Sequence, residues 1–311
     1  MDEHKGRSVN NWIAIDWGTT RLRVWLLDTQ GAVVAARESD RGMGQLAPGE
    51  FEAALLVLVN DWLADGQVTQ AVACGMVGAR QGWIEAPYVQ VPCPPVQQGS
   101  ILAPVSDPRL SVRILPGLCQ QQPTADVMRG EETQIAGLLA TQPEFAGVIC
   151  LPGTHTKWVE IAGGQIGQFR TFMTGELFAL LSGQSVLRHS LQGDGWDDAS
   201  FTEALSGVIS RPESGTAQLF GLRAADLLQG QSPAVGRAKL SGLLIGLELA
   251  GARTYWEGQD VVLIGDARLC QRYADGLTLQ GCTVQVADAT GMTLAGLAAA
   301  QQTLREDQDA T

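Results

Sequence analysis

The sequence lacks both an excess of positive charge and a long uninterrupted apolar run. It carries 33 acidic against 21 basic residues, a formal net charge of -12 at pH 7. This charge repels phosphate backbones and anionic lipids, so neither nucleic acid nor a membrane surface is an expected partner. The opening residues MDEHKGRSVN have no apolar centre of a secretory signal, and charges or glycines interrupt the most apolar internal stretches. We therefore expect a cytoplasmic protein.

Cysteine pairs and aromatic residues are also scarce. The six cysteines include no CxxC pair, which argues against a zinc site and a disulfide framework, and only 6% of residues are aromatic. In contrast, 45% of the 311 residues are hydrophobic, enough to bury a substantial core. The length and the internal pattern predict two domains, residues 1–142 and residues 143–311.

The first domain begins with three apolar or alternating segments joined by short turns. IAID, LRVWLLD and AVVAARE predict an antiparallel meander of strands, connected by WGTT and DTQG. Helical spacing then predicts a helix ending at Gly66, followed by a buried strand at QAVACG. Residues 86–123 are rich in Pro, Gly and Gln and predict loops with short strands, and residues 125–141 predict a helix.

The second domain repeats the opening of the first. GVICLPGTHTKWVEIAGGQI matches WIAIDWGTTRLRVWLLDTQGAV as an apolar run, a residue-Gly-Thr turn, an alternating run and a second Gly-containing turn. Gly153 and Thr154 fall opposite Gly18 and Thr19. The last third predicts two helices, GRAKLSGLLIGLELAGARTYW and TGMTLAGLAAAQQTL, with strands at VVLIG and TVQVA between them. Two related lobes are implied.

The first turn has the residues of an anion site. Gly18 permits close approach, and the hydroxyls and N–H groups of Thr19 and Thr20 can cradle a phosphate, with Arg21 next to them. Asp16 would repel a phosphate unless Mg²⁺ or its bound water lay between them, so it is the expected metal ligand. The alternative is a simple hairpin in which Asp16 and the threonines only satisfy turn hydrogen bonds.

The second turn supplies Gly153, Thr154, His155 and Lys157 as candidate phosphate-binding residues. Lys157 could offset phosphate charge, or strand alternation could point it to solvent. His155 is more often a turn residue than a base. Gly265, at the end of VVLIG, is a further candidate nucleotide contact.

Taken together, these segments resemble the sugar-kinase branch of the actin, Hsp70 and hexokinase superfamily. The resemblance implies an α/β protein with two ribonuclease H-like lobes, the actin-like ATPase fold, flanking a nucleotide cleft, with ATP and Mg²⁺ as cofactors. The segments similar to phosphate-1, connect-1, phosphate-2, adenosine and connect-2 are, in that order, IAIDWGTTRLRVWLLD, ADVMRGEETQIAGLL, ICLPGTHTKWVEI, VVLIGDARLC and LSGLLIGLELAGA. Leu151 in place of a second aspartate, and Asp266 in place of a glycine, depart from the superfamily pattern.

A closer resemblance, over about Ile13 to Leu297, is to the 2-dehydro-3-deoxygalactonokinase family. It implies phosphorylation of the 6-hydroxyl of 2-dehydro-3-deoxy-D-galactonate by ATP during galactonate breakdown. The first lobe would then hold the phosphate-1 hairpin and the acceptor, and the second the phosphate-2 hairpin and the adenosine. The motifs that carry it are RGMGQL, CGMVGARQGWIEAPYVQVPCP, RGEETQIAGLL, LPGTHTKWV and FMTGELFALL.

Related sugar kinases place a catalytic Asp just before the connect-1 helix, and Asp126 is the residue that matches. Asp126 could instead cap the helix. Glu131 and Glu132 suit the helix dipole, and Glu131 is an expected neighbour of the acceptor; either could be the base if the alignment shifts. In MTGELF, Thr174 is the expected N-cap of a helix and Glu176 a possible contact of a substrate hydroxyl.

The carboxylate of a keto acid favours a planar guanidinium clamp. Arg80, in a glycine-punctuated loop with Trp83, ranks first, although a surface Arg beside a core Trp is as good an interpretation. Arg41 is a further substrate-binding candidate, and the remaining nearby arginines are Arg21, Arg23 and Arg129.

Other functions remain open at this point. A kinase for another sugar or sugar acid, or a nucleotide-driven binding module, would use the same fold. Acceptor-stimulated formation of ADP separates a kinase from a binding module. A homodimer is possible, since apolar residues near the C-terminus could bury an interface or only a core.

Overall fold

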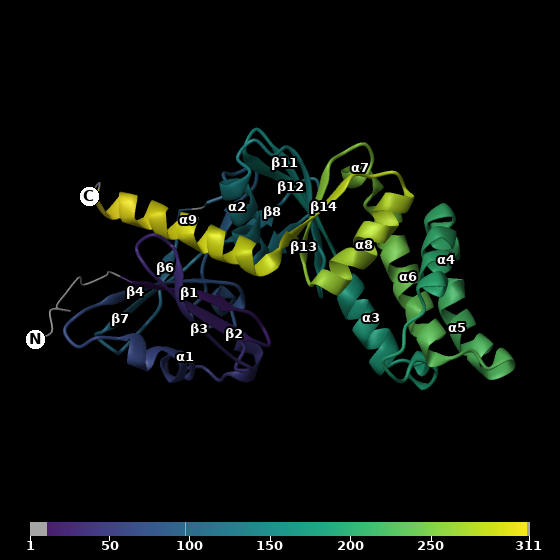
Figure 1. Cartoon of the computed structure of the whole chain (residues 1–311), viewed down its shortest axis with the longest axis horizontal. Helices are drawn as coiled ribbons and strands as arrows, with labels where there is room; N and C mark the ends of the chain where they lie inside the picture. The colour runs from purple at the N-terminus through teal and green to yellow at the C-terminus, as the bar shows by residue number, and fades with distance from the viewer. Residues whose placement is uncertain (1–10, 97, 310–311) are drawn as a thin grey trace, which may run out of the picture. The chain divides into compact units, whose positions relative to one another are not determined.

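The computed structural model describes residues 11–96 and 98–309, which form two compact units (Figure 1). Among the described residues, unit 1 contains residues 11–144, 164–166 and 290–309, and unit 2 contains residues 145–163 and 167–289. The first boundary lies two residues from the expected one. The last helix differs from expectation, because Leu297 and Ala300 pack with Trp12 and Trp25 in the core of unit 1.

Unit 1 is built on a six-stranded sheet with the order β3-β2-β1-β4-β7-β6. The first three strands form the predicted antiparallel meander, whereas β4 runs parallel to β1 and β7 parallel to β4. Asp16 pairs directly with Arg23 in this register. The strands are β1 (Trp12–Trp17), β2 (Leu22–Leu27), β3 (Val33–Ser39), β4 (Thr69–Cys74), β6 (Ile101–Leu102) and β7 (Leu110–Ile114).

A second, three-stranded sheet in unit 1 changes one prediction. The predicted helix over residues 125–141 begins only at Glu131, because Asp126 to Met128 pair with a neighbouring strand and Gly130 has a φ of 109°. The sheet has the order β5 (Tyr88–Gln90), β8 (Gly117–Gln120), β9 (Asp126–Met128), and the helices of unit 1 are α1 (Phe51–Val59), α2 (Glu131–Thr141) and α9 (Ala289–Asp309).

Helices α2 and α9 cross at two glycines. A Cβ on Gly137 would overlap the carbonyl oxygen of Met292, and a Cβ on Gly296 would overlap that of Thr133. Only glycine permits backbones to approach this closely. The helix expected to be connect-2, residues 240–252, faces α4 at Gly242 and Gly246 instead of α2.

Unit 2 repeats the sheet of unit 1. Its order is β12-β11-β10-β13-β14, with β10 antiparallel to β11 and parallel to β13, which is parallel to β14. The sequence repeat and the predicted α/β fold are thereby confirmed. The strands are β10 (Gly147–Leu151), β11 (Thr156–Ala162), β12 (Gln165–Phe172), β13 (Val261–Gly265) and β14 (Val284–Asp288).

Helices pack beside the sheet of unit 2. Gly242 and Gly246 face α4 at Phe201 and Leu205, where the absence of a Cβ permits close helix packing. No helix in the described part of the chain is long and apolar enough to cross a membrane. The helices of unit 2 are α3 (Thr174–Gly183), α4 (Asp198–Ser210), α5 (Gly215–Gln229), α6 (Pro233–Gly251), α7 (Arg253–Trp256) and α8 (Ala267–Leu279). Short 3-10 helices in unit 1 are η1 (Met43–Gln45), η2 (Asn60–Trp62) and η3 (Met76–Gly78), and those in unit 2 are η4 (Val186–Ser190) and η5 (Pro212–Ser214).

Candidate active site

Asp16 lies near the end of β1 in unit 1 and forms an ion pair with Arg23. The pair uses Oδ2 of Asp16 and Nη2 of Arg23, which face each other across the β1–β2 hairpin. Burial raises the pKa of Asp16 above its usual value, and the neighbouring guanidinium opposes this shift. Arg23 was a candidate for the substrate carboxylate; it instead holds Asp16.

Two glycines leave space beside Asp16. A Cβ on Gly75, which follows β4 with a φ of 92°, would lie 2.8 Å from the carbonyl oxygen of Trp17 and 3.5 Å from Oδ1 of Asp16. A Cβ on Gly130, which precedes α2, would lie 3.3 Å from the Cα of Gly75. The ends of β1 and β4 therefore meet the start of α2 around one carboxylate.

This arrangement fits a magnesium ion that is shared with phosphate oxygens. Mg²⁺ prefers oxygen ligands, and proteins often hold it through one or two carboxylates plus substrate phosphates. Oδ1 of Asp16 borders the space that Gly75 leaves free. The described residues contain no group of three or more His, Cys, Asp or Glu that could hold a metal without a substrate.

The segment that follows β3 is hydrogen-bonded to the β1–β2 turn. The N–H of Met43 donates to the carbonyl of Gly18 at 2.9 Å, and the N–H of Gly44 donates to that of Thr19 at 2.9 Å. A Cβ on Gly42 would overlap the backbone of Thr20. The RGMG segment thus fixes the backbone of the turn, a role that the sequence motif did not reveal. Thr19, Thr20 and Arg21 stay exposed.

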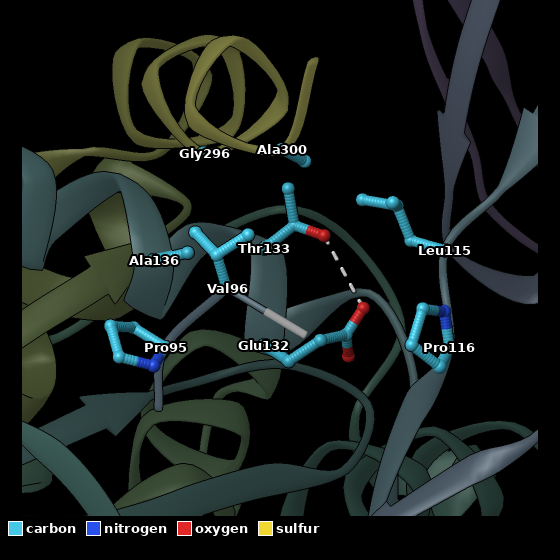
Figure 2. A pocket seen from close by; sticks show the side chains of 9 residues that line it. All are labelled: Pro95, Val96, Leu115, Pro116, Glu132, Thr133, Ala136, Gly296 and Ala300. Carbon is cyan, nitrogen blue, oxygen red and sulfur yellow. Dashed lines mark hydrogen bonds between the residues drawn. The ribbon is translucent and has the colours of Figure 1, made fainter. Parts of the chain in front are cut away.

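Glu132 is a buried carboxyl group at the start of α2. Its Oε2 accepts from the N–H of Gly130 at 2.6 Å, and its Oε1 accepts from the hydroxyl of Thr133 at 3.3 Å. Burial, with a contribution from the charge of Glu131, raises the pKa of Glu132 to about 7. Glu132 and Thr133 border a cavity of about 20 Å³, space for one water, under Gly296 and Ala300 of α9 (Figure 2).

The two candidate bases occupy different elements. Asp126 is half-buried in β9, opposite Gln120, and its Oδ1 accepts from the N–H of Val127 at 2.8 Å. It does not cap α2, whose N-cap is Gly130. Glu131 is the first residue of α2 and accepts from the N–H of Arg129 at 3.2 Å.

The candidate carboxylate clamps are distributed over unit 1. The side chain of Arg80 is 80% exposed and lies 3.5 Å from Glu85, in agreement with the surface interpretation, and that of Arg41 lies 3.9 Å from Glu50. Trp83 is partly buried and packs against the core, where it stacks on Phe51 with a centroid distance of 6.1 Å.

Arg129 is the buried arginine of the candidate set, with 7% of its surface exposed. Its Nη2 donates to the carbonyl of Ala86 at 2.7 Å, and its guanidinium lies 4.3 Å from the ring centroid of Tyr88. Its Nε and Nη1 are buried and have no hydrogen-bond partner among the described residues.

In unit 2, the β10–β11 turn packs against the start of α3. The N–H of Glu176 donates to the carbonyl of Thr154 at 3.0 Å, and a Cβ on Gly175 would overlap the carbonyl oxygen of Gly153. His155 pairs with the carboxylate of Glu176 at 2.5 Å, so both side chains belong to the wall of the turn. Gly153 itself borders open space.

Lys157 is buried, and its Nζ donates to the hydroxyl of Thr171 at 2.8 Å. The alternative in which it points to solvent is therefore wrong. Gly265 lies where β13 reaches the same turn, because a Cβ there would come within 2.8 Å of the carbonyl oxygen of Pro152. Asp266, the departure from the superfamily pattern, caps α8 by accepting from the N–H of Leu269 at 3.0 Å.

A buried hydrogen-bond network joins the elements around this turn. The carboxylate of Glu248 on α6 accepts from Nε1 of Trp158 at 2.8 Å and from the hydroxyl of Tyr273 at 2.7 Å. The hydroxyl of Thr174 also forms a hydrogen bond with Glu248. Thr174 was expected to be the N-cap of α3, but Met173 occupies that position and Thr174 is the first residue of the helix. Sequence reasoning missed Glu248; a lone Glu within the apolar run LLIGLELAG was its signal.

The turn, α3, α6 and α8 line a cavity of about 300 Å³ in unit 2 that is open to solvent. This is the lower end of the usual range for small-molecule sites, and apolar walls with a few polar groups are typical of such sites. Its lining consists of Gly153, Thr154, Thr174, Gly175, Phe178, Ser241, Leu244, Ile245, Leu269, Arg272 and Tyr273.

Residues 16–300 match the model of the 2-keto-3-deoxy-galactonokinase family. The chain belongs to this family. The 2-dehydro-3-deoxygalactonokinase of Escherichia coli (strain K12) is 38% identical over 276 residues, 88% of this chain and 91% of the relative. A protein of Rhizobium meliloti (strain 1021) assigned to the same activity is 39% identical over 306 residues, 94% of this chain and 97% of the relative.

A crystal structure extends the likeness to the fold. It is of a Sinorhizobium meliloti protein assigned to the galactonokinase activity, with a TM-score of 0.87 and 39% identity over 94% of this chain and 96% of that one. The family resemblance found in the sequence is therefore confirmed, and membership in this kinase family implies use of ATP and a small-molecule acceptor.

Proposed function

We propose that this protein transfers the γ-phosphoryl group of ATP to the 6-hydroxyl of 2-dehydro-3-deoxy-D-galactonate. Family membership over residues 16–300 carries the choice of acceptor. The meeting of Asp16, Gly75 and Gly130 in unit 1 supports the chemistry, because it combines a carboxylate with space for an anion. The lined cavity in unit 2 supports nucleotide binding there.

The reaction needs one proton acceptor and charge compensation for the phosphates. The 6-hydroxyl loses its proton to a carboxylate, its oxygen bonds to the γ-phosphorus, and ADP leaves. Asp126 is the proposed base, and Glu131 is the second candidate because it follows Gly130, which lies against Gly75. Bound Mg²⁺ would neutralise phosphate charge, and Asp16 would hold it directly or through water.

The remaining predicted contacts are part of the proposal. Thr19, Thr20 and Arg21 of the first turn, and Gly153, Thr154 and Lys157 of the second, contact phosphate groups, with Gly265 near the nucleoside. Arg41, Arg80 and Trp83 contact the sugar acid, whose carboxylate needs a guanidinium. Arg80→Ala tests the proposed contact between Arg80 and the sugar acid, which needs its own test because that side chain is 80% exposed.

The decisive experiment measures ADP release with Mg²⁺-ATP across sugars and 2-keto-3-deoxy acids. We expect strong stimulation by 2-dehydro-3-deoxygalactonate and little by aldoses. If another sugar acid stimulates best, the acceptor assignment fails while the kinase assignment remains. If no acceptor stimulates turnover, a nucleotide-driven binding module becomes the better explanation.

Asp126→Asn and Glu131→Gln are measured in the same assay. Loss of the base lowers kcat by about 10²- to 10⁴-fold. We expect this loss for Asp126→Asn, with the Kd for ATP unchanged. A large loss in Glu131→Gln alone assigns the base to α2 and removes Asp126 from the chemistry.

A further inference from the structure

Arg272 is the charged side chain among the residues that line the cavity of unit 2. It lies on α8 directly before Tyr273, whose hydroxyl bonds to Glu248. The other walls include Phe178, Leu244 and Ile245, which are apolar. A cation at the border of an apolar cavity requires an explanation, because burial costs free energy unless the charge is compensated.

The guanidinium of Arg272 is stacked on an aromatic ring. It lies 3.6 Å from the ring centroid of Trp196, well within the range of a cation–π contact. Trp196 is itself fixed, since its Nε1 donates to Oδ1 of Asp198 at 2.8 Å and its ring packs against Phe201. Trp196 does not line the cavity, whereas Arg272 does.

The guanidinium of Arg272 is not paired with any carboxylate that the structure describes. Within the described residues it forms no ion pair within 4.0 Å and no hydrogen bond to a protein acceptor. Burial lowers the pKa of Arg272, the charge of Arg237 lowers it further, and the carboxylates of Asp266 and Asp198 act in the opposite direction. The side chain is therefore held by stacking and keeps its N–H groups available.

We propose that Arg272 stacks on the purine base of the nucleotide, with Trp196 beneath it, and so determines the nucleotide specificity of this kinase. The proposal rests on the proposed function, since it places the nucleoside of ATP in this cavity. A guanidinium plane held flat by an indole offers its other face to a second π-system. This gives a layered arrangement of Trp196, Arg272 and base.

The stack predicts a preference for purines. Stacking energy grows with the overlapping ring area, and removal of a stacking side chain commonly costs about 1–3 kcal/mol per base. The larger ring system of ATP or GTP should therefore gain more from Arg272 than that of CTP or UTP. A phosphate-binding arginine would not distinguish among these nucleotides.

Calorimetric titration of Arg272→Ala with ATP and with inorganic tripolyphosphate tests the proposal. We expect the Kd for ATP to rise about tenfold, while the Kd for tripolyphosphate stays unchanged. The ratio of KM values for CTP and ATP should fall toward one. Arg272→Lys keeps the charge but not the plane and should restore little ATP affinity.

Arg268→Ala is the matched control, since Arg268 is exposed on the same helix and does not line the cavity. Thermal unfolding of each variant shows whether it is folded. An equal rise in Kd for ATP and tripolyphosphate would assign Arg272 to the phosphates and overturn the proposal, as would an unchanged Kd for ATP. Absence of ATP binding by the unaltered protein is a different result, and it defeats the proposed function itself.

Discussion

Glu248 is the residue whose surroundings have the clearest effect on stability. Glu248 is 2% exposed, and its hydrogen-bond donors are neutral groups such as the indole of Trp158 and the phenol of Tyr273. Burial raises the pKa of Glu248 to about 7, and the hydrogen bonds only partly oppose this. A buried carboxyl group without a cation thus favours its protonated form.

The pH dependence of unfolding follows from this shift. Below pH 4.5 Glu248 is protonated in both the folded and the unfolded state, so it does not lower the free energy of unfolding. As the pH rises from 4.5 toward 7, only the unfolded chain releases the proton, and the free energy of unfolding falls. Above pH 7 both states are ionised and the loss is complete. The loss is on the order of 3 kcal/mol. We expect the free energy of unfolding to decrease less between pH 5 and pH 8 in Glu248→Gln than in the unaltered protein.

Chemical denaturation at several pH values measures this decrease. Glu213→Gln, at an exposed position, is the control and should follow the unaltered protein. Glu132 contributes a loss in the same pH range, so the dependence should shrink in Glu248→Gln without disappearing. An unchanged pH profile would mean that Glu248 has the same pKa in the folded and the unfolded protein, which contradicts the shift.

Residue roles were predictable from sequence where a local rule applied. The apolar run before Asp16 and the glycine after it predicted a carboxylate at a strand end beside a turn. Its pairing with Arg23 follows from strand register, which the sequence suggests but does not determine. The burial of Arg129 and Lys157 depends on segments distant in the chain, and no local pattern reports it.

At the scale of elements, α2 and α9 cross with their backbones in close contact. Gly137 and Gly296 each face a carbonyl oxygen of the opposite helix. We expect Gly137→Ala to lower the free energy of unfolding by about 3 kcal/mol, because an added methyl group must push the helices apart. Urea denaturation measures the change.

Gly221→Ala provides the control for helix propensity. Gly221 lies inside α5, and a Cβ there meets nothing within 4 Å. Alanine should stabilise that helix by about 1 kcal/mol. If Gly137→Ala is equally stabilising, the close crossing does not exist in solution.

Sequence patterns predicted most elements and misjudged those whose limits depend on tertiary contacts. Apolar spacing alone could not separate β9 from α2, because Val127 and Met128 suit either conformation; only pairing with β8 decides between them. Likewise, the glycines of α6 and of α9 look alike in sequence. Gly242 and Gly246 of α6 face α4, whereas Gly296 of α9 faces α2.

At the scale of the whole molecule, the chain leaves unit 1, forms unit 2 and returns with α9. We expect deletion of residues 290–311 to unfold unit 1, since Leu297 and Ala300 complete a core cluster with Trp12 and Trp25. Limited proteolysis should then degrade unit 1 while fragments of unit 2 persist. A chain ending at Leu304, which retains these core residues, should resist cleavage; equal resistance in both chains would contradict the role of α9.

The return of α9 also orders the events of synthesis. Ribosomes deliver the chain from its amino end, so β1 and β2 emerge early with one side of Trp12 and Trp25 uncovered. Leu297 and Ala300 become available only after all of unit 2, which ends at Ala289, has been translated. The unit that is made first is therefore the unit that is finished last, and until then it depends on chaperones or on its own solubility to keep those indole rings from other chains.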